Sequence, residues 1–330
     1  MMRALVPAPA PIGCFGKLPA CADFVKVVHD LAAIEVLDDW MASVMRLLPS
    51  SARWKINYDA MAPVSFAFLG AARHHALAGH LVASHDLSGR RFPFLLMCSL
   101  DVADPAGFVA RAPLACAPVW DYGATTAARL LADADPTPQL RTIPAAQVAV
   151  DAAQAADALH CFMETATIGA LGGLLRQGGA PIDCARLILA LGLLLQPVMH
   201  SQRADLTKSL VLPLPRDPAQ RHRVAAFWLA LVAPFLRSAA VDLAVFITHQ
   251  DEHPVLVLGA CDAAAETLRA IIDPLAAAEQ QISFADTGWI DDQLRQDVDV
   301  RKLASYLGGP QLTLKVAHEL FLQTFIGAAP

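Results

Sequence analysis

Three apolar runs of strand length follow one another between residues 64 and 100 with only short turns between them. The first, Val64 to Phe68, alternates large and small side chains with a period of two, as a strand on a packed face does. A polar turn leads into the second, Ala76 to Ser84, and a Ser-Gly turn precedes the third, Phe92 to Leu100. Because such short turns can only join antiparallel neighbours, the chain is predicted to build an antiparallel sheet rather than a βαβ wind.

Helical patterns surround these strands. Residues 34–48 carry apolar side chains at helical spacing, and a proline follows them. Later in the chain, Asp183 and Asp217 are predicted to begin helices that Pro197 and Pro234 end or kink. The fold class is therefore predicted to be α/β in the sense of α+β, an antiparallel sheet flanked by helices. The remaining elements expected are a strand pair at 241–248 and 254–259, a helix from Asp262, and a final helix from about 313 to 326.

A chain of 330 residues is about twice the length of a typical domain, so two domains are expected. Prolines cluster within residues 133–157, where such clusters commonly separate packed units. The predicted division is an amino-terminal domain over 1–145 and a helix-rich α/β domain with a strand hairpin over 146–330.

Apolar residues make up 55% of the chain and charged residues 17%, which raises the question of a membrane span. The longest apolar runs, 187–199 and 227–236, are shorter than the roughly 18 to 20 residues that a span needs. They predict buried helices without membrane insertion. The alternative that these helices form a homodimer interface is not decided by the sequence. The start lacks a secretory signal, and the seven cysteines include no Cys-x-x-Cys pair, so a cytoplasmic location is expected.

The charge pattern bears on partners. The formal net charge is −6, and no run of basic residues is longer than Arg90-Arg91. This argues against a sequence-independent grip on nucleic acid and favours a protein or small-molecule partner.

Four histidines fall within twelve residues, which is the usual raw material of a zinc site: His74, His75, His80 and His85. On the predicted strand, His80 and His85 have opposite parity and face different sides of the sheet. We therefore expect no metal, no cofactor and no enzymatic activity. A metal-dependent hydrolase that uses the His74 to His85 cluster remains the alternative.

Two segments carry a more specific pattern. Residues 16–25 read Gly-Lys-Leu-Pro-Ala-Cys-Ala-Asp-Phe-Val, and residues 84–93 read Ser-His-Asp-Leu-Ser-Gly-Arg-Arg-Phe-Pro. They resemble the two signatures of the TagF family, a Gly-Lys-Leu-Pro followed by Gly-Asp-Phe, and a Ser-x-Asp followed by Gly-Arg and Phe-Pro. Ala22 and Leu87 depart from these signatures, since glycine and arginine are usual there. The resemblance is specific over about residues 11 to 110.

The resemblance implies a role rather than a reaction. TagF proteins are accessory factors of bacterial type VI secretion systems that restrain secretion after translation, by binding the forkhead-associated scaffold protein of the system. Their amino-terminal domain is similar to a longin or profilin layer of sheet and helices. By this resemblance the chain is a non-catalytic repressor with that scaffold as its partner. A structural subunit of the secretion apparatus is a further alternative.

Two hypotheses describe what the motif residues do. In the interaction hypothesis, Lys17, Arg90 and Arg91 present a cationic face to an acidic partner, with Phe24 or Phe92 as an apolar anchor. In the structural hypothesis, the same groups cap turns and pair with one another, for instance Asp23 with Arg90, and so hold the two segments together. The predicted partner-binding residues are Lys17, Asp23, Phe24, Asp86, Arg90, Arg91 and Phe92.

Overall fold

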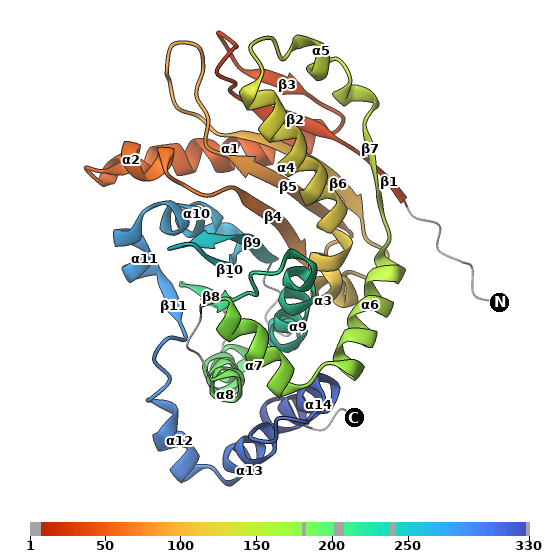
Figure 1. The fold of residues 1–330 in the computed structure, drawn as a ribbon, viewed down its shortest axis with the longest axis vertical. Helices are drawn as coiled ribbons and strands as arrows, with labels where there is room; N and C mark the ends of the chain where they lie inside the picture. The colour runs from red at the N-terminus through yellow and green to blue at the C-terminus, as the bar shows by residue number, and fades with distance from the viewer. Residues whose placement is uncertain (1–7, 180–182, 201–207, 238–241, 328–330) are drawn as a thin grey trace, which may run out of the picture.

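A nine-stranded sheet forms the centre of the molecule (Figure 1). The computed structural model describes residues 8–179, 183–200, 208–237 and 242–327. Within them, the strands run in the order β11-β8-β10-β9-β4-β5-β6-β2-β3, and every neighbouring pair except β11 and β8 is antiparallel. The predicted fold class, a sheet of antiparallel strands flanked by helices, is confirmed. The strands are β2 (Gly13–Gly16), β3 (Val25–Val27), β4 (Val64–Gly70), β5 (His75–Val82), β6 (Phe94–Asp101), β8 (Ser209–Pro213), β9 (Asp242–Gln250), β10 (His253–Ala260) and β11 (Gln281–Ser283).

Both faces of the sheet are covered, because its central strands are apolar on both sides. On one face, α1 and α10 pack against side chains such as Phe66 and Phe246. On the other face, α3, α4 and α9 pack against Ala67, Val245 and their neighbours. A separate two-stranded sheet of β1 (Ala8–Pro11) and β7 (Gln147–Val150) lies beside β6 and α4. The helices are α1 (Leu31–Leu47), α2 (Trp54–Asp59), α3 (Pro105–Ala115), α4 (Ala117–Ala132), α5 (Thr137–Leu140), α6 (Ala152–Thr165), α7 (Ile168–Gln177), α8 (Cys184–Leu195), α9 (Pro218–Arg237), α10 (Ala264–Ile272), α11 (Pro274–Gln280), α12 (Ile290–Gln296), α13 (Val298–Leu307) and α14 (Leu314–Phe325).

The strands of the two halves belong to one sheet. β4 from the first half pairs antiparallel with β9 from the second, and Phe66 lies opposite Phe246 in that pairing. Trp40 of α1 contacts both rings, with centroids 5.3 Å from Phe66 and 5.9 Å from Phe246. This contact buries aromatic surface from three elements at the point where the halves meet. The division at residue 145 stays a prediction, since a shared sheet does not show which part folds alone.

The helix predictions succeed at most boundaries. Asp183 caps α8 by accepting hydrogen bonds from the backbone N–H groups of Ala185 and Arg186, and α8 ends before Pro197. α9 begins at Pro218 as predicted but continues past Pro234 to Arg237, so that proline does not end it. The run 187–199 forms most of α8 and the short 3-10 turn after it, the run 227–236 forms part of α9, and both are largely buried inside the molecule. Of the helices described, none is long and apolar enough to cross a membrane.

Removing the Phe246 ring should destabilise the junction between the halves. Phe246→Ala is expected to lower the free energy of unfolding by about 3–5 kcal/mol, because it empties space that Trp40 and Phe66 border. Leu275→Ala, at a side chain 73% exposed on α11, serves as control and should change stability by less than about 0.5 kcal/mol. Urea unfolding followed by circular dichroism measures both, and equal stability of the two variants would contradict the role given to this contact.

Candidate functional site

The two motif segments lie side by side at one end of the sheet (Figure 1, top). We call residues 16–24 the first motif loop and residues 84–93 the second motif loop. Two hydrogen bonds join them directly: the Leu87 N–H donates to the Cys21 carbonyl at 2.8 Å, and the Ser84 hydroxyl donates to the Lys17 carbonyl at 2.6 Å. In the pairing of β2 with β6, Gly16 at the start of the first motif loop lies opposite Phe94, the residue that follows the second motif loop.

Gly16 shows why the first motif begins with glycine. Its φ is +130°, in the region that side chains disfavour, and a Cβ built there would overlap the carbonyl of Pro93. Any larger residue would therefore push the Phe-Pro end of the second motif loop away. The glycine of the first motif and the proline of the second are therefore in direct contact.

Asp86 is the centre of the loop pair, and its side chain has no exposed surface. The Lys17 ammonium and the Arg90 Nε donate to one carboxylate oxygen at 2.9 and 2.7 Å. The other oxygen accepts from the Ser88 N–H, the Ser88 hydroxyl and the Arg90 N–H, at 3.0, 2.7 and 3.0 Å. Burial raises the pKa of the Asp86 carboxyl, but these hydrogen bonds outweigh it and hold the pKa well below its usual range. Asp86 is thus a buried carboxylate that organises both loops.

The predicted cationic residues differ in how far their charges are exposed to solvent. The Lys17 side chain is only 8% exposed, so its charge faces Asp86 rather than solvent. The Arg90 side chain is 65% exposed and also donates to the Ala22 carbonyl of the first motif loop. The suggested pair of Asp23 with Arg90 is wrong, because Arg90 pairs with Asp86 and the Asp23 carboxylate accepts from the neighbouring Phe24 N–H.

Helix α2 supplies two residues that the sequence predictions did not include. The Tyr58 hydroxyl donates to the Ser84 carbonyl at 2.9 Å and accepts from the Ser84 N–H at 3.1 Å. Asp59 accepts two hydrogen bonds from Arg91, at 2.8 and 2.6 Å. No local pattern in residues 54–59 indicated that α2 reaches the second motif loop.

Three phenylalanines link the loops on their outer side. Phe15 stacks on Phe24 with ring centroids 5.6 Å apart, and Phe92 meets both rings edge on. The Lys17 ammonium lies 5.0 Å from the Phe24 ring centre. Phe24 is nevertheless 44% exposed, and Leu87 at the tip of the second motif loop is 69% exposed. The exposed surface of the loop pair therefore includes two apolar side chains together with Arg90 and Asp23.

Residues 13–144 match the model of the TagF N-terminal domain, described as type VI secretion system-associated. Over these residues the chain carries a TagF N-terminal domain. The family prediction made from the two motifs is therefore confirmed for this part of the chain, and the matched domain is one described as type VI secretion system-associated.

A solved structure, PA0076 from Pseudomonas aeruginosa PAO1, is similar at 26% sequence identity with a TM-score of 0.34. The match covers 41% of this chain and 61% of that one. A search of curated proteins gave no match.

The four histidines of the cluster between residues 74 and 85 make four separate contacts. The Nδ1 atoms of His74 and His85 lie 2.9 Å from the carbonyls of Val102 and Asp86, respectively. His75 pairs with exposed Asp101, and His80 contacts the Ser65 hydroxyl. Burial lowers the pKa of His80 to about 4, so this imidazole is neutral near pH 7. In the described part of the chain, no group of three or more His, Cys, Asp or Glu side chains could hold a metal ion.

The Asp86 carboxylate should stabilise the two motif loops. Asp86→Asn leaves the buried Lys17 ammonium without its counter-charge, so the melting temperature at pH 7 should fall clearly. Asp23→Asn makes the same change on an exposed carboxylate and should shift the melting temperature by less than about 2 °C. Thermal unfolding by circular dichroism measures both, and equal melting temperatures for native and Asp86→Asn protein would contradict this role.

The same contact predicts a pH dependence. The folded-state pKa of Asp86 lies below its unfolded value of about 3.9, so its contribution is complete above that pH and is lost as the pH falls toward the folded pKa. The difference in melting temperature between native and Asp86→Asn protein should stay constant from about pH 8 to about pH 5 and shrink below about pH 4. A difference that grows on acidification would be inconsistent with a depressed pKa.

Proposed function

We propose that this protein is a non-catalytic negative regulator of a type VI secretion system, which acts after translation in the bacterial cytoplasm by binding the forkhead-associated scaffold protein of that system. The family match supplies the association with type VI secretion. The binding partner and the repression follow from the resemblance of the two motifs to those of TagF proteins. The proposal concerns the loop pair, because the motif residues are concentrated there.

One observation carries the proposal: the motif residues build a surface instead of a catalytic pocket. Buried Asp86 and Lys17 hold the loops together, and the residues exposed on the outside include Phe24, Leu87, Arg90 and Asp23. Aromatic, aliphatic and arginine side chains are those that protein interfaces favour at their centres. The loops are held in place before a partner arrives, which lowers the entropy lost on binding.

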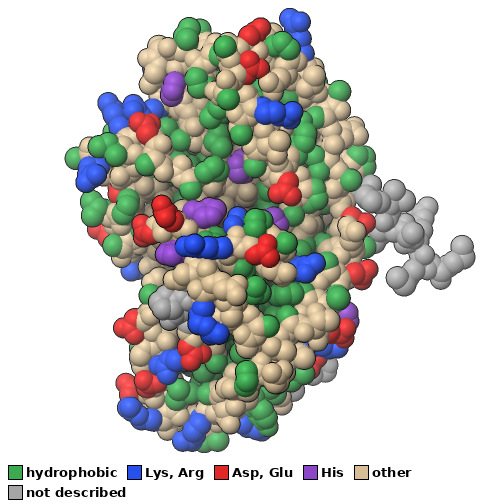
Figure 2. Space-filling model, in the orientation of Figure 1, with side chains coloured by type: hydrophobic (Ala, Val, Ile, Leu, Met, Phe, Trp, Pro, Cys, Tyr) green, Lys and Arg blue, Asp and Glu red, His purple; other side chains and the backbone are tan. Residues whose placement is uncertain are grey.

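The charge that this surface offers to an acidic partner is that of Arg90. Lys17 and Arg90 share the single charge of Asp86, so these three residues carry one net positive charge, and the Asp23 carboxylate is also exposed in the first motif loop. Arg91 is balanced by Asp59. Figure 2 shows positively and negatively charged side chains interspersed over the face that it draws. On that face, recognition by one cluster of residues is therefore favoured over attraction by an extended patch of one charge.

A matched pair of substitutions tests this surface. Leu87→Glu places a carboxylate at the centre of the loop surface and should weaken capture of the purified scaffold protein at least about tenfold. Leu275→Glu makes the same change at a similarly exposed leucine on α11 and should leave capture unchanged. Binding is measured by surface plasmon resonance, and both variants should unfold at the native temperature. If Leu87→Glu binds as tightly as Leu275→Glu, the scaffold does not use this surface.

The hydrolase alternative has its own test. Each histidine of the cluster is engaged in a local contact, so we expect purified protein to keep less than stoichiometric zinc after dialysis. Elemental analysis measures the metal. Stoichiometric zinc that is retained by native protein and lost from His74→Ala protein would support the alternative instead.

A further inference from the structure

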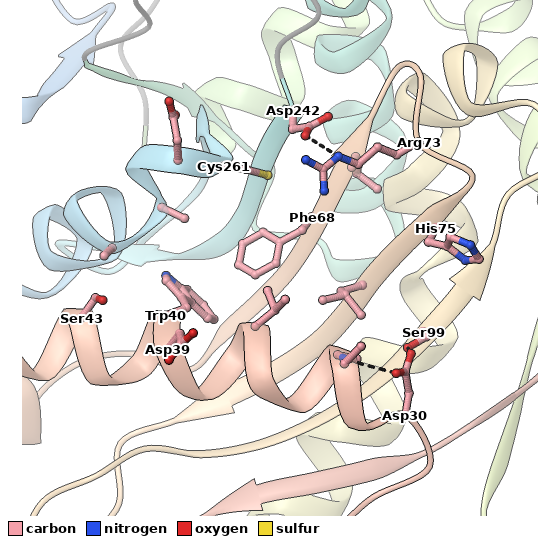
Figure 3. A pocket seen from close by; sticks show the side chains of 18 of the residues that line it. Asp30, Asp39, Trp40, Ser43, Phe68, Arg73, His75, Ser99, Asp242 and Cys261 are labelled. Atoms are coloured by element: carbon pink, nitrogen blue, oxygen red, sulfur yellow. Dashed lines mark hydrogen bonds and ion pairs between the residues drawn. The ribbon is translucent and has the colours of Figure 1, made fainter.

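A groove of about 730 Å³ lies between α1, the turn from β4 to β5, and the start of α10 (Figure 3). We call it the α1–α10 groove. It lies at the first residues of β5, whereas the second motif loop follows the last ones. Since β5 has eight residues, the groove and the motif loops are roughly 24 Å apart along it, and they are different sites.

The floor of the groove is an apolar part of the sheet face. Phe68 of β4 projects into its middle from behind α1 and is only partly buried, unlike Phe66 two residues earlier (Figure 3). Val36 on α1 is 53% exposed and lines the same groove. Among the described residues, no helix covers this strip of the sheet, so a ligand can bury apolar surface here.

The wall of the groove holds an unsatisfied hydrogen-bond donor. Trp40 is 7% exposed, and its indole N–H has no partner. The indoles of Trp120 and Trp228 are also buried, and they donate to the Phe66 and Pro213 carbonyls at 2.9 and 3.0 Å. Buried polar groups are almost always paired. The Trp40 ring is thus held by packing alone, against Phe66, Phe68 and Phe246.

The rim of the groove is acidic. Arg73 and Asp242 form an ion pair, as Figure 3 shows, so their charges neutralise each other. Asp39 and Asp262 have no ion pair or hydrogen bond among the described residues. Asp30 accepts from the Ser99 hydroxyl at 2.6 Å, and this hydrogen bond lowers its pKa, so it is ionised at neutral pH. Three carboxylates therefore face the groove without a cation paired to them, and a cationic occupant would be attracted.

The topology selects the shape of that occupant. β4, β5 and β9 are all internal strands of the sheet, so no free strand edge lies in the groove to accept an added strand. The space is bordered by two helices above a sheet face, which suits a third helix laid across side chains. We propose that the α1–α10 groove binds an amphipathic helix of a partner protein whose apolar face is flanked by lysine or arginine. The apolar face covers Phe68 and Val36, and the basic residues meet Asp39 and Asp262.

This inference does not depend on the scaffold partner proposed above. The direct probe is a synthetic helical peptide of about 15 residues with leucines at i, i+3, i+4 and i+7 and lysines elsewhere. Fluorescence anisotropy of the labelled peptide measures binding to the full chain. The lysine peptide should bind, and a version with glutamate in place of lysine should bind at least about tenfold more weakly.

Two neighbouring carboxylates on α1 give a matched control. Asp39→Lys acts in the groove and should weaken lysine-peptide binding about tenfold. Asp38→Lys changes the net charge equally from an exposed position outside the groove and should change binding less than about twofold. Val36→Ser should also weaken binding, whereas Leu87→Glu on the motif loops should not.

Several results would overturn the proposal. Absence of binding, or equal effects of Asp38→Lys and Asp39→Lys, would mean that the groove does not recognise the peptide. Equal binding of a peptide with a central proline would show that no helix is required. A native dimer that Asp39→Lys dissociates would identify a second copy of this chain as the occupant.

Discussion

The antiparallel pairing of β4 with β9 is the contact on which the rest of the molecule depends. It joins strands that are nearly two hundred residues apart in the chain into one sheet and brings Phe66, Phe246 and Trp40 together. The pairing places α10 beside α1 on one face and α9 beside α3 on the other. The TagF domain therefore shares its sheet with the second half of the chain, and the α1–α10 groove is made by residues from both.

Within that frame, a buried charge organises the motif loops. Taking a carboxylate out of water is costly unless hydrogen bonds replace the lost solvation. Asp86 receives five such bonds, from a lysine, an arginine, a serine and two backbone groups. This accounts for the Asp and Arg of the second motif and for the Lys of the first, whereas the Ser of the second motif, Ser84, donates to the Lys17 carbonyl. Gly16 supplies the close backbone approach that lets the loops meet.

The structural hypothesis describes the buried motif residues, whereas the interaction hypothesis stays a prediction for those at the surface. Lys17 and Asp86 are interior groups, whereas Leu87, Phe24 and Arg90 form the surface. The most exposed of these is Leu87, the position that departs from the family signature. In the proposed regulator, buried ion pairs thus position a small surface of apolar and charged side chains. The α1–α10 groove at the other end of β5 offers a second surface, whose rim is acidic.

The sequence by itself determined the local structure. The alternation in Val64–Phe68, the caps at Asp183 and Asp217, and the proline after α8 act within a few residues, so periodicity and capping chemistry sufficed to predict them. The two motifs also identified the TagF domain. Only the tertiary structure decided which carboxylate Arg90 meets, that Tyr58 reaches Ser84, and that β4 pairs with β9. Those contacts depend on how distant segments are brought together. Which of several similar carboxylates an arginine pairs with produces no local pattern in the sequence, so it could not be predicted.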